Sequence, residues 1–254
     1  MAVACITGAS SGIGLHLAEQ LAAKGFDLIL IARNGERLQE LADAWREKFR
    51  VQITCHALDL ADPAAVEQLC GLIGIPDVLV NNAGFGDFAE FHAAEWDKLQ
   101  RVMQVNVLAV ARLAHHVLGG MRQRRSGRIL NVASPAGFSP GPMMAVYFAT
   151  KAFVLHFSEA LATECRGTGV TVTTLCPGAT ATEFHKVAGF RHDHLLFAPP
   201  IASHPARVAR IAVKALLTGK RLSIPGISNQ LSVLGIRVVP RWLAARIAAW
   251  ALRR

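Results

Sequence analysis

Short hydrophobic runs alternate with amphipathic segments along the whole chain. The runs, such as residues 28–32, show no polar alternation, which is typical of strands buried on both faces of a parallel sheet. The segments between them carry the spacing of helices that follow each strand. Strands are predicted at residues 3–6, 27–32, 51–57, 77–81, 128–133, 170–176 and 221–225. Helices are predicted near residues 12–24, 35–49, 63–73, 95–118, 147–166 and 205–218.

This order of elements predicts repeated βαβ units and therefore an α/β fold. We expect a Rossmann-type, doubly wound parallel sheet in a three-layer α/β/α arrangement. No internal repeat and no Gly/Ser linker interrupts the pattern, so residues 1–228 are predicted to form a single domain. Residues 229–254 are predicted to form a basic, apolar helical extension.

Composition and charge narrow the classes of function. Of the 254 residues, 52% are hydrophobic and 18% are charged, which excludes a mainly disordered chain. Lys and Arg number 27 against 18 Asp and Glu, a net charge of +9, yet residues 201–254 contain ten of the basic residues and no acidic one. The basic excess therefore belongs to the end of the chain. No groove-reading motif accompanies it, and we expect no nucleic-acid partner.

Cysteine usage and the chain start bear on the compartment. Five scattered cysteines, none in a Cys-x-x-Cys pair, argue against a disulfide framework and against a zinc site. We expect buried thiols and no bound metal. The chain begins without a secretory leader and has no stretch of 18 uncharged apolar residues, so a cytoplasmic protein without a transmembrane helix is predicted.

A glycine-rich turn joins the first predicted strand to the first helix, with the spacing Gly-x3-Gly-x-Gly. Glycines at this junction let the backbone approach a pyrophosphate, whose charge is favoured at a helix N-terminus. An ordinary turn with a helix start is the alternative. The candidate cofactor-binding residues here are Gly8, Ser10, Ser11, Gly12, Ile13 and Gly14.

The end of the second predicted strand indicates which dinucleotide binds. An acidic residue there would hydrogen-bond the ribose 2′-OH of NAD, whereas an arginine accommodates a 2′-phosphate. This chain has Arg33 at that point and Arg37 one helical turn later. A guanidinium suits a phosphate, so NADP(H) is predicted in preference to NAD(H). The alternative is that Arg33 only caps a solvated loop.

Two more segments follow strands at the carboxyl edge of the sheet, where open α/β sheets bind ligands. Asp59 and Leu60 are candidates for the adenine edge, although Asp59 also suits the approach to the next helix. Asn82, Ala83 and Gly84 follow the fourth strand. Asparagine there would either line the cofactor or tie strands together, and the sequence leaves both possibilities open.

The single tyrosine, Tyr147, lies four residues before Lys151 in a predicted helix, so phenol and ammonium share one helical face. A free phenol has a pKa of about 10 and becomes useful near pH 7 only if a nearby cation lowers it. Ser134 ends the fifth predicted strand, where a hydroxyl can hold a substrate carbonyl. A surface side-chain pair and an ordinary turn serine are the alternatives.

Together these motifs resemble the short-chain dehydrogenase/reductase family, in its NADP-preferring branch. The resemblance extends over roughly residues 1–225. It rests on Thr7-Gly8-x3-Gly12-Ile13-Gly14, Asn81-Asn82-Ala83-Gly84, Asn106, Ser134, Tyr147-x3-Lys151 and Pro177-Gly178-x3-Thr182.

The resemblance implies a role for each matching residue. Tyr147 would be the general acid/base, and Lys151 would lower its pKa and bind the nicotinamide ribose. Ser134 would polarise the substrate carbonyl, and Asn106 would hold a water in a proton relay. The other implied cofactor contacts are Asn82, Ala83, Gly84, Pro177, Gly178 and Thr182.

The expected activity is the interconversion of a hydrophobic carbonyl compound and its alcohol by hydride transfer. In the resembling family, residues 178–204 correspond to the substrate loop. The alternative is an interaction protein that senses a dinucleotide and turns over little substrate. One form of this alternative places the protein at a membrane surface. Loop histidines 185, 192 and 194 lack a partner constellation, and no metal is expected there. The apolar pocket is predicted to include residues 138–144, Phe184, Phe190, Leu195, Leu196 and Phe197.

The extension at 229–254 departs from the compact end that is usual in the family. Arg246 falls between Trp242 and Trp250 at helical spacing, so the apolar face is imperfect. We favour packing against a sister subunit, in a homodimer or homotetramer, or a lid over the site. Peripheral membrane contact is the less favoured alternative.

Overall fold

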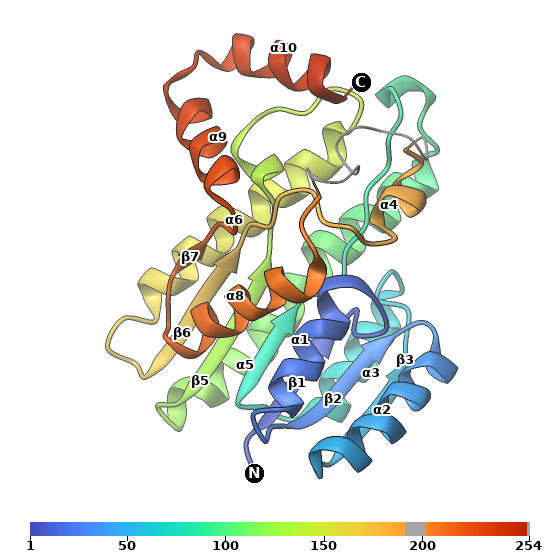
Figure 1. The fold of residues 1–254 in the computed structure, drawn as a ribbon, viewed down its shortest axis with the longest axis vertical. Helices are drawn as coiled ribbons and strands as arrows, with labels where there is room; N and C mark the ends of the chain where they lie inside the picture. The colour runs from blue at the N-terminus through green and yellow to red at the C-terminus, as the bar shows by residue number, and fades with distance from the viewer. Residues whose placement is uncertain (191–201, 253–254) are drawn as a thin grey trace.

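A parallel sheet forms the centre of the molecule in the computed structural model, which describes residues 1–190 and 202–252 (Figure 1). Within these ranges the sheet has seven strands in the order β3-β2-β1-β4-β5-β6-β7, and every pairing is parallel. The predicted doubly wound α/β fold is confirmed. The strands are β1 (Val3–Thr7), β2 (Asp27–Ala32), β3 (Ile53–Ala57), β4 (Val78–Asn81), β5 (Gly127–Val132), β6 (Val170–Leu175) and β7 (Leu222–Ser223).

Helices cover both faces of this sheet. One core contains Ile6 with apolar residues of three helices, α1, α2 and α8. Cys5, the neighbour of Ile6 on β1, belongs to the opposite core, formed with α3, α5 and α6. Successive side chains of a strand point to opposite faces, which explains why the strands need apolar residues at every position. The helices are α1 (Gly12–Ala22), α2 (Gly35–Phe49), α3 (Pro63–Ile73), α5 (Val110–Gln123), α6 (Ala145–Glu164) and α8 (Pro205–Leu217).

The predicted helix at 95–118 is wrong in its details. The segment forms α4 (Trp96–Met103), a π-helical turn (Gln104–Ala109) and then α5. The side chain of Asn106, inside that turn, makes hydrogen bonds with both backbone groups of Phe85. Such turns occur frequently at functional sites.

Other boundaries differ from the sequence expectation for local reasons. β3 begins at Ile53, not at residue 51, because the Gln52 N–H donates to the Asp27 carboxylate rather than to the strand ladder. β7 has only two residues. Short elements not predicted are the 3₁₀ turns Phe91–Ala93 and Pro135–Phe138 and α7 (Phe184–Ala188).

The end of the chain forms two helices, α9 (Ile227–Val238) and α10 (Arg241–Leu252), which lie at the end of the molecule opposite the N-terminus (Figure 1). None of the helices in residues 1–190 and 202–252 is both long and apolar enough to cross a membrane.

A ladder of polar side chains runs through the sheet and into α6. Asn81 Nδ2 donates to Asn131 Oδ1 at 2.9 Å, and Asn131 Nδ2 donates to Ser158 Oγ at 2.9 Å. All three side chains are buried. Buried polar groups are costly unless they are paired, so this ladder ties β4, β5 and α6 together.

We predict that Asn131→Ala destabilises the protein because it leaves Asn81 Nδ2 and Ser158 Oγ without this partner. The expected loss is about 1–3 kcal/mol in total, because Ser158 Oγ still donates to the Val154 carbonyl oxygen at 2.6 Å. Urea unfolding measures the loss, with the exposed Gln123→Ala as the control. Ser158→Ala breaks only one rung and should cost less; a loss from Asn131→Ala as small as that of the control would contradict the prediction.

Candidate active site

The candidate site lies at the carboxyl ends of β1 and β4. These strands are neighbours in the sheet, and the chain runs outward from them in opposite directions. Such a switch point leaves a crevice between the connections that follow the two strands. The glycine turn after β1 and the segment 82–84 after β4 meet there.

Close packing forces glycine into this turn. Gly8 has φ +67°, and a Cβ added to it would lie 2.8 Å from Asn82 Nδ2. A Cβ on Gly14 would collide with the Gly8 carbonyl oxygen. Asn82 Nδ2 itself donates to the carbonyl oxygens of Thr7, at 2.9 Å, and Gly8, at 3.2 Å. Asn82 therefore ties β4 to the turn, which settles one of the two roles that the sequence left open.

The N-terminus of α1 is suited to an anion. Its N-cap residue, Ser11, makes no capping hydrogen bond with its side chain, and the first turn contains no acidic residue. Ser10 and Ile13 are partly exposed and Ser11 is exposed. The N–H groups of this turn and the positive end of the helix dipole thus face the crevice, as pyrophosphate binding requires. The residues present fit a dinucleotide.

The two predicted arginines differ in their surroundings. Arg33 is exposed just after β2, and its charge contributes to lowering the pKa of Asp59. Arg37 already forms an ion pair with Glu40, 2.8 Å away on the same helix. Asn34 lies between them and caps α2 by accepting from the Arg37 N–H. Arg33 is therefore the better placed of the two for a 2′-phosphate.

The Asp59 carboxylate has more interaction partners within the protein than the sequence suggested. Its carboxylate accepts from the Ala61 N–H at 3.0 Å and pairs with Arg101 at 2.7 Å. These interactions outweigh desolvation and lower the pKa of Asp59. The next residue, Leu60, is buried. The structure thus gives Asp59 a structural role at the approach to α3, whereas contact with adenine stays a prediction.

Tyr147, Ser134 and Lys151 are brought together at the start of α6. Ser134 follows β5, accepts from the Ala136 N–H at 3.2 Å, and is a hydrogen-bond partner of the Tyr147 phenol. Lys151 Nζ lies 5.8 Å from the centre of the Tyr147 ring. It donates to the Val132 carbonyl oxygen at 2.8 Å, so the lysine is anchored to the end of β5.

The electrostatics of this pair differ from the sequence expectation. Burial raises the pKa of Tyr147 to about 12, although the hydrogen bond with Ser134 acts in the opposite direction. Burial also lowers the pKa of Lys151 to about 8. The expected lowering of the phenol pKa by Lys151 is not seen, because desolvation dominates and the ammonium is directed at the Val132 carbonyl.

Asn106 connects this region to the segment after β4. Its Nδ2 donates to the Phe85 carbonyl oxygen at 2.9 Å and to Thr150 Oγ1 at 3.0 Å. Thr150 Oγ1 donates in turn to the Tyr147 carbonyl oxygen at 2.7 Å. The amide of Asn106 is thus used structurally, and a water held for a proton relay stays a prediction. The sequence reasoning missed Thr150, although its place between Tyr147 and Lys151 marks it.

Gly84 is tightly packed against side chains of the candidate site. An added Cβ would lie 3.0 Å from Asn106 Oδ1 and 3.4 Å from Lys151 Nζ. The N–H of Ala83, next to it, donates to Thr7 Oγ1 at 3.0 Å. Segment 82–84 therefore forms a wall between the glycine turn and the Lys151 ammonium.

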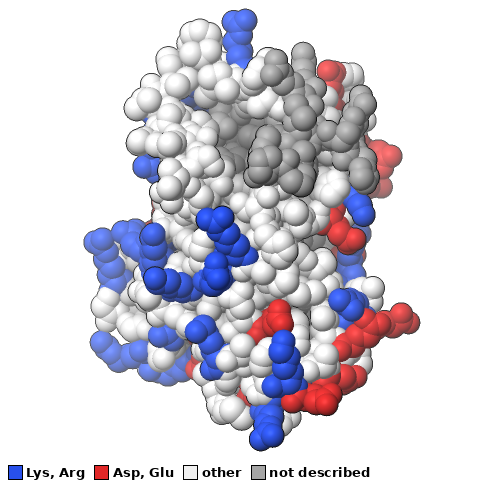
Figure 2. All heavy atoms as spheres, in the orientation of Figure 1, with Lys and Arg blue, Asp and Glu red and all other residues white. Residues whose placement is uncertain are grey.

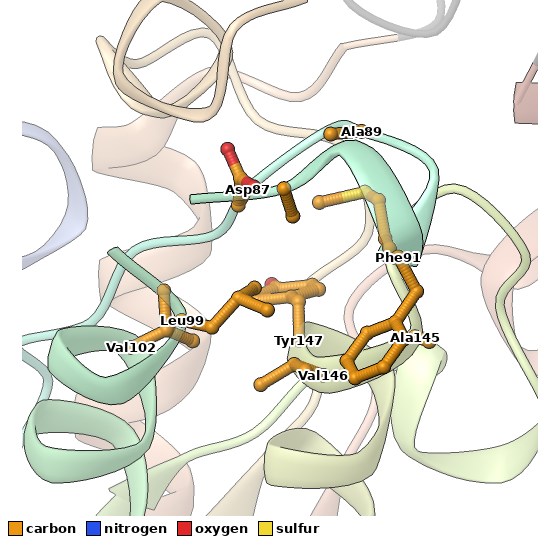
Figure 3. Close-up of a pocket in the computed structure, with 10 residues that line it drawn as sticks. Asp87, Ala89, Phe91, Leu99, Val102, Ala145, Val146 and Tyr147 are labelled. Atoms are coloured by element: carbon orange, nitrogen blue, oxygen red, sulfur yellow. The ribbon is translucent and has the colours of Figure 1, made fainter. Parts of the chain in front are cut away.

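A small pocket opens beside the Tyr147 ring (Figure 3). Most of its lining comes from residues 87–102, to which sequence reasoning assigned no role. The lining is apolar except for Asp87. The Asp87 carboxylate pairs with Lys98 at 2.6 Å. The position of residues 87–102 directly after the Asn82–Gly84 motif is the sequence feature that could have indicated a role in the site. The lining residues are Asp87, Ala89, Phe91, Ala94, Leu99, Val102, Met144, Ala145, Val146 and Tyr147.

The predicted substrate loop contributes in part. The Phe184 ring lies 5.2 Å from the Tyr147 ring, and Phe190 stacks on Phe88 at 4.5 Å. Phe138, in contrast, packs in a separate cluster behind β5. Five residues named for this loop lie outside the described ranges: His192, His194, Leu195, Leu196 and Phe197.

The remaining candidate residues follow β6. A Cβ added to Gly12 would lie 3.0 Å from Thr182 Cγ2, so Thr182 covers the glycine turn. Gly178 faces Asn229 of α9 so closely that an added Cβ would collide with it. Pro177 is buried. Within the described parts of the chain, no three His, Cys, Asp or Glu side chains form a group that could hold a metal ion.

Comparison with known proteins agrees with this geometry. The family of short chain dehydrogenases matches residues 2–190. The chain belongs to this family. Very-long-chain 3-oxoacyl-CoA reductase of Homo sapiens is 35% identical over 190 residues, which cover 72% of this chain and 61% of that protein. The chain thus spans about three fifths of the length of the curated relatives that it matches first.

Other similar proteins are named for different activities. Inactive hydroxysteroid dehydrogenase-like protein 1 of Homo sapiens is 32% identical over 247 residues, 94% of this chain and 73% of that protein. Among solved structures, a short-chain dehydrogenase from Sphingobium yanoikuyae in complex with NADPH has a TM-score of 0.85 and 32% identity, covering 93% of this chain and 94% of that one. A 7β-hydroxysteroid dehydrogenase has a TM-score of 0.86 and 28% identity, covering 97% and 96%.

Burial of Lys151 predicts a specific dependence of stability on pH. Its pKa is 10.5 in the unfolded chain and about 8 in the folded protein, so between these values the unfolded chain binds more protons. The contribution of Lys151 to stability therefore rises with pH across this window. Relative to Lys151→Met, the wild-type free energy of unfolding should increase between about pH 8 and 10.5, by up to about 3 kcal/mol.

Denaturant unfolding at a series of pH values measures this difference. The exposed Lys214→Met on α8 is the matched control, and its pH dependence should be smaller than that of Lys151→Met. A wild-type advantage that stays constant or shrinks over the window would show that the ammonium is not desolvated.

Proposed function

We propose that this chain is an NADP(H)-dependent oxidoreductase that interconverts a hydrophobic carbonyl compound and its alcohol. The observation that carries the proposal is the position of Tyr147, which lines an apolar pocket while it shares one helix with the buried Lys151 and a hydrogen bond with Ser134. Family membership supports the reaction class. The apolar lining and the relatives named very-long-chain 3-oxoacyl-CoA reductase support a hydrophobic substrate.

The proposed mechanism assigns the proton chemistry to this chain's own residues. The nicotinamide cofactor, when bound, supplies or accepts the hydride. Tyr147 donates a proton to the carbonyl oxygen, which Ser134 holds by a hydrogen bond. With a pKa of about 12, Tyr147 carries its proton at neutral pH, as the proton donor in carbonyl reduction must. Lys151 is proposed to bind the nicotinamide ribose, and Asn106 to hold a water of the proton relay.

The cofactor is proposed to lie along the crevice between β1 and β4. The N-terminus of α1 would bind the pyrophosphate, with the loop after β6 on the nicotinamide side. Arg33 would bind the 2′-phosphate, and this supports NADP(H) over NAD(H). The structural neighbour in complex with NADPH is compatible with this preference.

A second candidate function is dinucleotide sensing with little turnover. It is favoured by one relative that is named inactive and by the high pKa of Tyr147. The presence of Asn106, Ser134, Tyr147 and Lys151 argues against it, because each member of the implied catalytic set is in place.

The oxidoreductase is further proposed to be cytoplasmic and to assemble into a homodimer or homotetramer.

We predict that Tyr147→Phe removes turnover and leaves NADPH binding intact, because only the hydroxyl that transfers the proton is lost. NADPH oxidation with a panel of apolar aldehydes, ketones and 3-oxoacyl thioesters measures turnover, and the thermal shift with NADPH measures binding. The control is Phe153→Leu, which alters an exposed ring on the same helix. More than a tenth of the activity left in Tyr147→Phe contradicts the role; a wild type that binds NADPH but reduces nothing favours the sensor.

We predict that Arg33→Ala weakens NADPH binding about tenfold or more while NADH binding changes little, because only NADPH carries the 2′-phosphate. Titration of both dinucleotides gives the two dissociation constants. The matched control is Lys24→Ala, which removes an exposed cation just beyond the C-terminal end of α1. Equal losses for the two dinucleotides would refute the assignment.

A further inference from the structure

One face of α9 is apolar and exposed. Ile227, Leu231, Leu234 and Val238 are 76%, 62%, 61% and 79% exposed. Their spacing of four, three and four residues places them in a single stripe along the helix. The opposite side of α9 packs onto the protein through the buried Val233. The stripe therefore lies on the side of α9 that faces solvent, while the other side of the helix packs against the rest of the protein.

The next helix also carries exposed apolar side chains. On α10, Trp242 is 63% exposed and Ile247 is 51% exposed, whereas Ala244 and Leu252 are buried. We call Ile227, Leu231, Leu234, Val238, Trp242 and Ile247 the C-terminal apolar surface. Large apolar side chains that gather in this way on a soluble domain mark a binding surface.

The charges around this surface all have one sign. Arg241 and Arg246 are exposed on α10, and residues 201–254 contain no Asp or Glu. In Figure 2 the upper left of the molecule, over α9 and α10, is mostly uncharged with blue at its margins and no red. A basic rim around apolar side chains is the combination that binds anionic lipid headgroups and the acyl region beneath them.

The same charges argue against a second copy of this chain as the occupant. Pairing two C-terminal apolar surfaces would bring Arg241 and Arg246 of both copies together with no acidic residue of the extension to balance them. Like charges placed opposite each other disfavour association. Tryptophan at such a surface suits the boundary between headgroups and acyl chains, where one end of the side chain is apolar and the other wet.

The surface is linked to the candidate site. Leu252, at the end of α10, packs in one cluster with Met144, Ala188 and Phe190, against which the rings of Tyr147 and Phe184 are partly buried. A protein docked through this surface would hold the apolar side of its pocket near the membrane. Resting on the proposed function, this arrangement suits a substrate that is dissolved in lipid.

We propose that α9 and α10 dock the protein peripherally onto an anionic membrane surface through the C-terminal apolar surface and its arginines. This reverses the order of preference that the sequence pattern alone suggested, because the six side chains are now seen to face solvent. The docking inference does not depend on the reaction that the site catalyses.

Vesicle co-sedimentation of the full-length protein tests the proposal without any measurement of activity. Vesicles of phosphatidylcholine and phosphatidylglycerol in equal parts should pellet the protein, and pure phosphatidylcholine should pellet much less. Raising the salt concentration should weaken binding to the anionic vesicles, because exposed charges are screened. Leu231→Gln/Leu234→Gln should lower the partition coefficient about tenfold or more.

The matched control is Leu72→Gln/Leu108→Gln, which changes two leucines of similar exposure far along the chain, 49% and 56%. It should bind as the wild type does. A wild type that stays in the supernatant with anionic vesicles, or equal partitioning of the two double variants, overturns the proposal. Sedimentation velocity then identifies the alternative occupant: an oligomer that Leu231→Gln/Leu234→Gln dissociates, without vesicle binding, assigns the surface to a second copy.

Discussion

The connection between β1 and β4 is the constraint on which the site depends. The two strands end side by side, and Asn82 holds them by donating to the carbonyl oxygens of Thr7 and Gly8. This short link leaves no volume for side chains at Gly8 or Gly14, and it directs the N-terminus of α1 into the crevice. A dinucleotide site therefore follows from backbone packing, before any side chain that could do chemistry is considered.

Burial governs the chemistry on the other side of the crevice. Tyr147 and Lys151 share a helix face, but burial favours the neutral form of each side chain. It raises the pKa of the Tyr147 phenol and lowers the pKa of the Lys151 ammonium. The ammonium of Lys151 also donates to the Val132 carbonyl oxygen, a contact that favours its charged form but is outweighed by burial. The result is a phenol that keeps its proton at neutral pH, as a proton donor in carbonyl reduction must.

The C-terminal helices add a feature that family membership does not require. Residues 1–200 are nearly neutral, whereas the last 54 residues, which include α8 and β7 of the sheet domain, are basic and end in two helices with exposed apolar side chains. Leu252 packs in the same apolar cluster as Met144 and Tyr147 of the pocket. Charge, exposure and position thus combine in a surface that suits a lipid interface next to an apolar pocket.

The sequence by itself determined the sheet, the glycine turn and the Tyr147–Lys151 spacing, because strand burial, helix starts and i,i+4 neighbours are local. Only the tertiary structure decided that Asn82 ties strands together, that Asp59 is taken by Arg101, and that residues 87–102 line the pocket. The same holds for the π-helical turn at Asn106 and for the phenol pKa. Each depends on which distant groups come close and how far water is excluded, and no local pattern contains that information.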